Sequence, residues 1–189
     1  ELEVVKLSRD KDDGARIGDR GLASLLQLHH LKVLHVKDAG ITGEGPNFMN
    51  GDCMSEGTIV ELMLPKSRGL CDAGVRNILQ KCSTELKSLD ISSTSIAGIN
   101  VKLPAGLEHL QLSKCYNLTD AGLTNLLKNC SKSLISLDLS HCLVTGDQLV
   151  IPFDRLKRLV LGHCPNLQDG GLTRILSQCP NLTFLDLSS

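Results

Sequence analysis

Aliphatic residues recur along the chain in a six-residue pattern whose first, fourth and sixth positions are apolar. Leu fills most of these positions, and Val or Ile replaces it at Val5, Val36 and Ile91. Residues two apart in a strand share a face, so the fourth and sixth positions point inward together. The pattern therefore predicts one short strand per copy. The eight copies begin at Leu2, Leu31, Ile59, Leu86, Leu107, Leu134, Leu156 and Leu182.

The spacing of the copies indicates the fold class. Successive copies start 21 to 29 residues apart, which is the period of leucine-rich repeats. A single copy cannot bury its own leucines, so the copies must stack with their strands side by side, about 4.8 Å apart. The sequence predicts an α/β leucine-rich repeat solenoid, a right-handed horseshoe with eight short parallel strands.

Long and short copies alternate. The long copies continue into apolar residues at helical spacing, as at Leu123, Leu126 and Leu127. The short copies continue through Gly into β-branched residues and Pro, as at Leu103-Pro104, which favours an extended return. Each expected helix follows an Asp that we predict to cap it or to favour its positive end. These residues are Asp19, Asp72, Asp120 and Asp169.

The alternation also defines the domain organisation. We predict one domain over residues 1–189, built from four double repeats of about 48 residues that start near 2, 59, 107 and 156. Helices are expected on the convex side of the long repeats. We expect the chain to be a fragment or a domain of a larger protein. Neither end has an evident cap, so further chain or a partner should cover an end, and a second copy could do so by end-to-end self-association.

Two segments depart from the repeat. Residues 44–58 form an insertion that contains Phe48, Met49 and Cys53, and Cys53 is a candidate exposed, reactive thiol. Residues 8–19 are charged and are expected to form a solvated loop. Within them, residues 10–14 match a calcium loop poorly, because the Gly falls one position early and Gly21 stands where the bidentate Glu belongs.

Most of the eight cysteines occupy two positions of the repeat. Eight residues after the start of a copy, a small residue with a polar atom is expected to turn the chain inward and to bond to neighbouring backbone. A second set ends the helices on their apolar face, where Cys acts as a small hydrophobe. The first set is Cys115, Cys142 and Cys164, and the second is Cys82, Cys130 and Cys179.

The cysteines also bear on the compartment. Ala, Ser and Thr occupy the same turn position in other copies, so disulfide pairing is not required, and reduced thiols favour the cytoplasm or nucleus. The chain contains no Cys-x-x-Cys pair, so we expect no zinc site and no cofactor. Three glycosylation sequons, at Asn117, Asn129 and Asn181, leave an extracellular location as the alternative.

Composition excludes several classes of function. The formal charge of −1 gives no basic excess for nucleic acid or a membrane surface. Aromatic residues make up 2% of the chain, too few for a base-stacking platform. No apolar run reaches the length of a membrane span. No catalytic motif is present either, so we predict that the chain is not an enzyme.

The outward residues of the strands form the candidate binding surface, a concave surface here called the sheet face. Asp90, Asp138 and Asp186 recur there, and His109 would lie between two of them, but no oxyanion donor accompanies a catalytic arrangement. The alternative is a solvated face that repeats because a gene segment was duplicated. We predict that a protein partner binds at Val33, His35, Glu61, Met63, Ser88, Asp90, His109, Gln111, Ser136, Asp138, Arg158, Val160, Phe184 and Asp186.

Residues 107–127, LEHLQLSKCYNLTDAGLTNLL, and 156–176, LKRLVLGHCPNLQDGGLTRIL, carry a family resemblance. They resemble the cysteine-containing leucine-rich repeat of F-box substrate receptors, an architecture shared with ribonuclease-inhibitor-like proteins. The resemblance implies a curved solenoid that recruits a protein substrate to a ubiquitin ligase. No F-box segment is visible in the sequence. The alternative function is an extracellular or surface recognition receptor.

Overall fold

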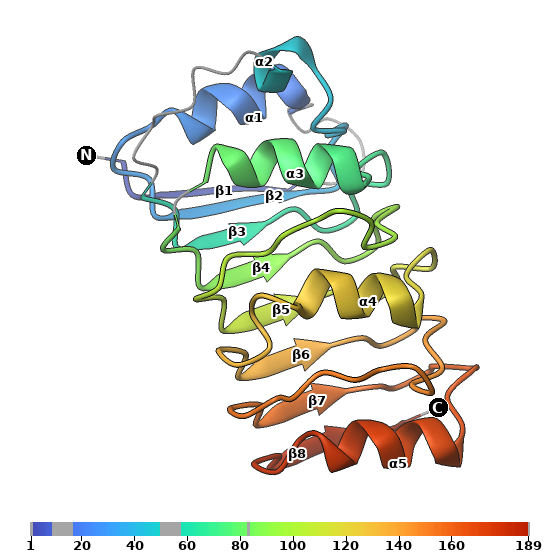
Figure 1. Ribbon diagram of the computed structural model, residues 1–189. Helices are drawn as coiled ribbons and strands as arrows, with labels where there is room; N and C mark the ends of the chain where they lie inside the picture. The colour runs from blue at the N-terminus through green and yellow to red at the C-terminus, as the bar shows by residue number, and fades with distance from the viewer. Residues whose placement is uncertain (1, 9–16, 50–57, 83, 189) are drawn as a thin grey trace.

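The computed structural model describes residues 2–8, 17–49, 58–82 and 84–188. Its strands form one parallel sheet in chain order, which confirms the predicted leucine-rich repeat solenoid (Figure 1). We number the repeats 1 to 8 after these strands. The strands are β1 (Val4–Ser8), β2 (Val33–Lys37), β3 (Glu61–Met63), β4 (Ser88–Asp90), β5 (His109–Gln111), β6 (Ser136–Asp138), β7 (Arg158–Val160) and β8 (Phe184–Asp186).

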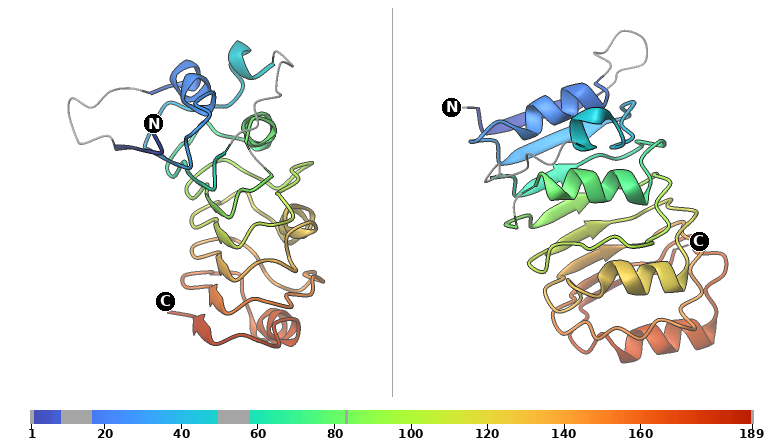
Figure 2. Two further views of the ribbon diagram at one scale, coloured as in Figure 1. Left: turned by 90° about the vertical axis from the view of Figure 1, so that its left-hand side faces the viewer. Right: turned by 45° about the horizontal axis from the view of Figure 1, so that its top comes forward.

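Helices cover one side of the sheet, and each long repeat contributes one, as predicted (Figure 2). They are α1 (Asp19–Leu26), α3 (Asp72–Gln80), α4 (Asp120–Leu127) and α5 (Asp169–Ser177). Repeats 4 and 6 return without a helix. In repeat 2 the sequence did not predict α2 (Pro46–Met49), where buried Phe48 anchors the insertion to the core. The expected loop at 9–16 and Cys53 lie outside the described residues.

A uniform register places equivalent residues in columns along the sheet. The central inward position of each strand pairs with the same position of the next, as in Leu89 with Leu110 and Leu110 with Leu137. These leucines are at most 1% exposed, and burying each contributes roughly 2 kcal/mol. Side chains at one outward position are stacked in the same way, so the sheet face has ordered columns of its own.

The turn after each strand uses a backbone conformation that the sequence did not reveal. The residue just before the small inward position has a φ of 55 to 64°, although none is glycine, and such residues are uncommon. Their N–H groups donate to carbonyls of the next repeat, so the ladder extends past the strands. The residues are Asp38, Lys66, Ser93, Lys114, His141 and His163.

Thr94 and the three turn cysteines bond to neighbouring backbone, as predicted, whereas the buried hydroxyl of Ser67 has no hydrogen-bond partner among the described residues. The thiols of Cys115, Cys142 and Cys164 donate to carbonyls of the preceding repeat at Sγ···O distances of 3.1 to 3.3 Å. Burial raises the pKa of Cys142 to about 12, so this thiol stays protonated and keeps its hydrogen to donate. The described cysteines are all unpaired.

The helix-start Asp residues do not cap their helices, but they lie at the positive end of each helix, which is the second predicted role. The cap positions belong to other residues, and Asp120 is the first residue of α4, where its charge does lie at the positive end of the helix. Its carboxylate mainly binds the turn of repeat 6, accepting from the Thr145 N–H at 2.8 Å and the Thr145 hydroxyl at 2.7 Å. Asp19 and Asp72 bind the turns of repeats 2 and 4 in the same manner. The Asp is therefore chiefly a link between repeats.

Each short-repeat turn also meets the helix that follows it. The turn at Ala97-Gly98 lies between Asp72 of repeat 3, which accepts both N–H groups, and Gly122 of repeat 5. The backbones come so close that a Cβ built at Gly122 would lie 1.8 Å from the Ala97 carbonyl oxygen. A long repeat thus binds the turn of the next repeat through its Asp carboxylate. The Gly in its helix leaves room for the turn of the preceding repeat. The packing therefore depends on the alternation, because each short-repeat turn needs a long repeat on both sides.

Candidate protein-binding surface

The fourteen residues predicted to contact a partner all lie on strands, at the two outward positions of β2 to β8. The first position forms the column Val33, Glu61, Ser88, His109, Ser136, Arg158 and Phe184. The second forms the column His35, Met63, Asp90, Gln111, Asp138, Val160 and Asp186. The structure therefore brings the predicted set together as two adjacent lines across the sheet face.

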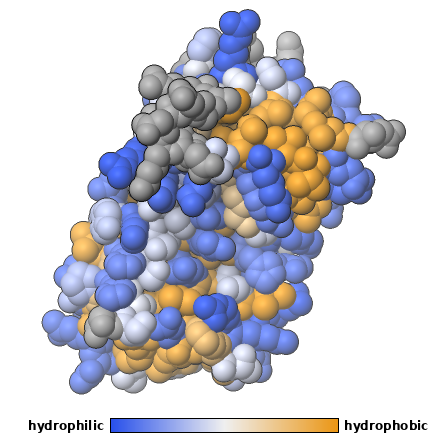
Figure 3. All heavy atoms as spheres, turned by 180° about the vertical axis from the view of Figure 1, so that it is seen from behind, coloured by the Kyte–Doolittle hydropathy of each residue, from blue (hydrophilic) through white to orange (hydrophobic). Residues whose placement is uncertain are grey.

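The sheet face is apolar toward its N-terminal end. Val33 and Met63 are half-buried, and their neighbourhood continues onto β1, where Val4 pairs with Val33 and is 49% exposed. Figure 3 views the molecule from behind and shows an apolar area near this end. Val4 was missed in the sequence because the first copy matches the repeat only loosely.

The centre of the sheet face is acidic. Asp90 and Asp138 lie on either side of Gln111 in one column. Each Oδ1 accepts the N–H two residues later, at Ser92 and Ser140, which holds the carboxylate on its strand. The outward positions of β3 to β6 carry Glu61, Asp90 and Asp138 but no Lys or Arg. This part of the surface therefore favours cationic side chains of a partner.

The register corrects the placement of His109. The sequence suggested that this ring lies between Asp90 and Asp138, but His109 pairs with Ser88 and Ser136 in the neighbouring column. Parallel strands in uniform register align equal positions, and His109 holds the first outward position while both Asp residues hold the second. His109 is therefore in a different column from the two Asp residues with which it would form a catalytic triad.

A histidine–carboxylate pair lies between the apolar and acidic parts. His35 Nε2 and Glu61 Oε1 are 2.6 Å apart across β2 and β3. Both side chains are about one-third exposed or less, so the contact is partly screened by solvent. The pair fixes two side chains in place at the border of the apolar region.

The C-terminal part of the sheet face combines charge with an aromatic ring. The Arg158 guanidinium lies 3.9 Å from the centre of the exposed Phe184 ring, a cation–π contact. Hydrogen bonds from the Ser188 hydroxyl and N–H, with lesser help from Arg158, hold the pKa of Asp186 below 3.8. Val160 does not offer the predicted contact area, because it is 9% exposed with Asp138 and Asp186 flanking it in register.

Two histidines are stacked at the rim of the sheet face. The rings of His141 and His163 have centroids 4.4 Å apart and planes inclined by 11°. Desolvation, and then the charges of His163 and Lys114, lower the pKa of His141. The neighbouring Cys142 and Cys164 thiols bond inward to backbone, so they face away from the rings, as predicted. Among the described residues no group of three or more potential ligands could hold a metal ion.

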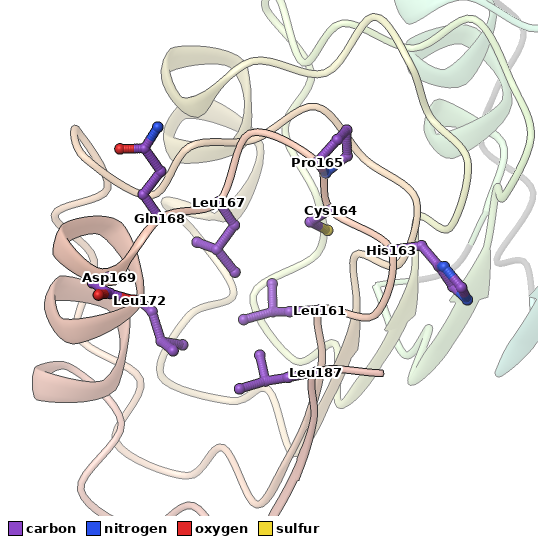
Figure 4. Close-up of a pocket in the computed structure, with 9 residues that line it drawn as sticks. All are labelled: Leu161, His163, Cys164, Pro165, Leu167, Gln168, Asp169, Leu172 and Leu187. Carbon is purple, nitrogen blue, oxygen red and sulfur yellow. The ribbon is translucent and has the colours of Figure 1, made fainter. Parts of the chain in front are cut away.

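A hollow opens beside β8, away from the sheet face. It is lined by Leu161 and Leu187 from the strand side and by Leu167 and Leu172 from the side of α5, and Cys164 also lines it (Figure 4). These residues occupy inward positions of the repeat, so the hollow is the exposed edge of the core. Leu187 is 44% exposed there.

None of the helices that the structure describes is long and apolar enough to cross a membrane.

Comparison with known proteins identifies the repeat. A family model described as "Leucine Rich repeat" matches residues 27–45. A search of curated proteins found no match. Among solved structures, the yeast structure titled "Crystal structure of Rad7 and Elc1 complex in yeast" is similar, with 17% sequence identity and a TM-score of 0.49. The alignment covers 90% of this chain and 60% of that one, less than two thirds of its length. The family match covers the strand and turn of repeat 2, and the eight stacked strands show the same repeat architecture along the described chain.

Proposed function

We propose that this leucine-rich repeat chain is a non-enzymatic recognition module that binds a protein partner on its sheet face. The observation that carries the proposal is the arrangement of that face: an apolar region at Val4 and Val33 adjoins an acidic centre at Asp90 and Asp138. Apolar anchors beside polar groups are the usual make-up of a protein interface. The partner segment would carry apolar side chains next to Lys or Arg.

Substrate recognition for a ubiquitin ligase is the more specific form of this proposal. Its support is the resemblance of residues 107–127 and 156–176 to the cysteine-containing repeat of F-box substrate receptors. The cytoplasm or nucleus is the proposed location, supported by unpaired cysteines that use their thiols as donors to backbone. Purification of the full-length protein from its cells should then bring down a ligase adaptor, and its absence from the purified complex would refute the ligase role.

Neutralising the acidic centre should weaken partner binding. In the Asp90→Asn/Asp138→Asn double variant, each Asn keeps the Oδ1 that accepts from Ser92 or Ser140, so the fold is retained while two charges are lost. We expect the dissociation constant of the purified partner, measured by isothermal titration calorimetry, to rise at least about tenfold. The partner would first be identified by affinity capture with the wild-type chain.

The matched control is Asp147→Asn/Asp154→Asn, which removes the same charge from exposed residues outside the strands. It should bind the partner as the wild type does. Equal affinity of the wild type and the Asp90→Asn/Asp138→Asn variant would contradict the proposed surface. An equal loss in both variants would show that net charge, not the sheet face, determines binding.

We also propose that copies of residues 1–189 associate through the edge at β8. Among the described residues β8 pairs with a strand on one side only, and the hollow beside it exposes Leu187 and other core positions. Sedimentation velocity should show a concentration-dependent increase in sedimentation coefficient that Leu187→Lys abolishes. Val150→Lys, at a loop residue that is 71% exposed, should leave it unchanged. A wild-type chain that stays monomeric at high concentration would contradict this association.

A further inference from the structure

The turns that follow β3, β4 and β5 enclose a hollow with a basic lining. Arg68 of repeat 3 and Lys114 of repeat 5 border it, and the turn at residues 93–95 forms its middle. Tyr116 and Asn117 complete the lining, and the volume is about 590 Å³. None of the described residues that line this hollow is Asp or Glu. It lies at the rim, apart from the two columns of the sheet face.

The hollow arises from the alternation of the repeats. In repeats 3 and 5, two residues separate the small inward residue from the next buried apolar residue, as between Cys115 and Leu118. In repeat 4 one residue separates Thr94 from Ile96. The turns on both sides therefore project past the turn of repeat 4. Asn117 Nδ2 donates to the Ser95 carbonyl at 3.3 Å and ties the two turns together.

The turn of repeat 6 shows what the fold itself requires. It has the same short form between two longer turns, and Asn166 Nδ2 donates to the Leu143 carbonyl at 3.1 Å, the counterpart of the Asn117 bond. The side chains around it are different. Counterparts of Arg68, Ser95, Lys114 and Tyr116 are Tyr116, Leu143, His163 and Pro165. The Asn therefore has a structural role in both turns. Arg68 and Lys114 are replaced by other residues at the equivalent positions, so the repeat does not require them.

The groups that line the hollow suit an anion. Arg68 and Lys114 are exposed, and neither forms a salt bridge with the described residues. A guanidinium offers a planar fork of donors that matches phosphate, and an ammonium adds a compact charge. The hydroxyl of Tyr116 can also donate. The Ser95 hydroxyl is already used, since it donates to the Arg68 carbonyl at 2.6 Å and fixes the position of that backbone.

We propose that this hollow binds a phosphorylated serine or threonine side chain of a peptide. A phosphate monoester carries close to two negative charges, which Arg68 and Lys114 can match. The volume lies in the range of sites that hold much larger ligands than one phosphate, so flanking peptide residues fit as well. A nucleic acid fits poorly, because such a partner needs many phosphate contacts and the chain has a formal charge of −1.

The test is a nuclear magnetic resonance titration of the full 189-residue chain. The probe is a pool of blocked hexapeptides with one central phosphoserine and randomised flanks. We expect saturable shifts of the amide signals of residues 93–95 and 114–117, with an affinity at least tenfold higher than for the same pool with serine. Inorganic phosphate and a single-stranded oligonucleotide should bind at least tenfold more weakly than the phosphopeptides.

Variants separate the site from general charge. Arg68→Gln/Lys114→Gln should lower the phosphopeptide affinity at least tenfold, while Arg155→Gln/Lys157→Gln, with the same charge lost elsewhere, should bind as the wild type does. Circular dichroism would confirm that both variants are folded. The proposal is overturned if the phosphopeptides produce no saturable shifts, if Arg68→Gln/Lys114→Gln binds them as tightly as the wild type, or if free phosphate or the oligonucleotide binds more tightly than they do. The titration needs no sheet-face partner, so its failure and that of the proposed function are distinguishable.

Discussion

Gly122→Ala should destabilise the solenoid by roughly 3 kcal/mol or more. The added Cβ would lie 1.8 Å from the Ala97 carbonyl oxygen. No rotamer change can relieve this clash, because a Cβ and a backbone oxygen are both fixed by the backbone. The turn cannot move away from the new Cβ, because the N–H groups of Ala97 and Gly98 donate to Asp72 Oδ1 at N···O distances of 3.1 and 2.9 Å. Urea unfolding followed by circular dichroism measures the loss.

Gly106→Ala is the matched control for this prediction. A Cβ at Gly106 would meet the Lys87 ammonium nitrogen at 3.4 Å, the far end of a flexible side chain. We expect a change within about 0.5 kcal/mol. A Gly122→Ala chain that unfolds at the same urea concentration as the Gly106→Ala chain would show that the contact between repeats 4 and 5 opens at little cost. Hydrogen exchange would locate such an opening.

The repeat pattern predicted the strands, the order of the sheet and the long-repeat helices, because each depends on residues close together in the sequence. Leu110 lies in a pattern that shows its strand and its buried face together. The turn positions of Cys115 and Cys142 were predicted as well, since a small polar residue recurs at a fixed distance from each strand. Local periodicity thus sufficed for the scaffold.

Contacts between repeats were harder to predict. The carboxylate of Asp72 sits at a helix start, where a cap is the natural expectation, yet its partners lie 25 to 27 residues away. The left-handed turn residues, such as Lys114 and His141, share no residue type that would reveal their conformation. The basic hollow was missed for a similar reason, because Arg68 and Lys114 belong to different repeats and meet only through stacking.

The candidate sheet face was predictable in membership but not in detail. Alternation along each strand assigned all fourteen residues to the outward face. Exposure and register depend on neighbouring strands, so the sequence did not show that Val160 is nearly covered or that His109 lies outside the column of Asp90 and Asp138. Val4 entered the apolar region only once β1 was seen to pair with β2.

Asp120→Ala should cost about 2 to 4 kcal/mol, because it removes the acceptor that links repeat 5 to repeat 6. The carboxylate accepts from the Thr145 N–H and hydroxyl, from the Gly146 N–H at 3.2 Å and from the Gln148 N–H at 3.3 Å. Asp120 is 8% exposed, so water replaces these bonds incompletely. Urea unfolding at pH 7 would measure the difference from the wild type.

Asp169→Ala supplies the control, since Asp169 is likewise the first residue of a helix but is exposed, and among the described residues no hydrogen bond to its carboxylate is seen. Its loss should cost about 0.5 kcal/mol, the value of a charge near a helix N-terminus. Equal losses in the two variants would mean that Asp120 acts through the helix alone and that its bonds to repeat 6 contribute nothing.

The pH dependence tests the same link by a second route. Burial by itself would raise the pKa of Asp120, but hydrogen bonds from the Thr145 hydroxyl, the Thr145 N–H and the Gly146 and Gln148 N–H groups outweigh it and hold the pKa below 3.8. The ionised form is favoured in the folded chain, so this stability is complete above pH 3.8 and is lost as the pH falls through the folded-state pKa. The difference in unfolding free energy between wild type and Asp120→Ala should therefore be constant from about pH 5 to pH 7 and shrink below pH 3.8. A difference that stays constant down to pH 2 would contradict an ionised link, because protonation would then leave the bonds to repeat 6 unchanged.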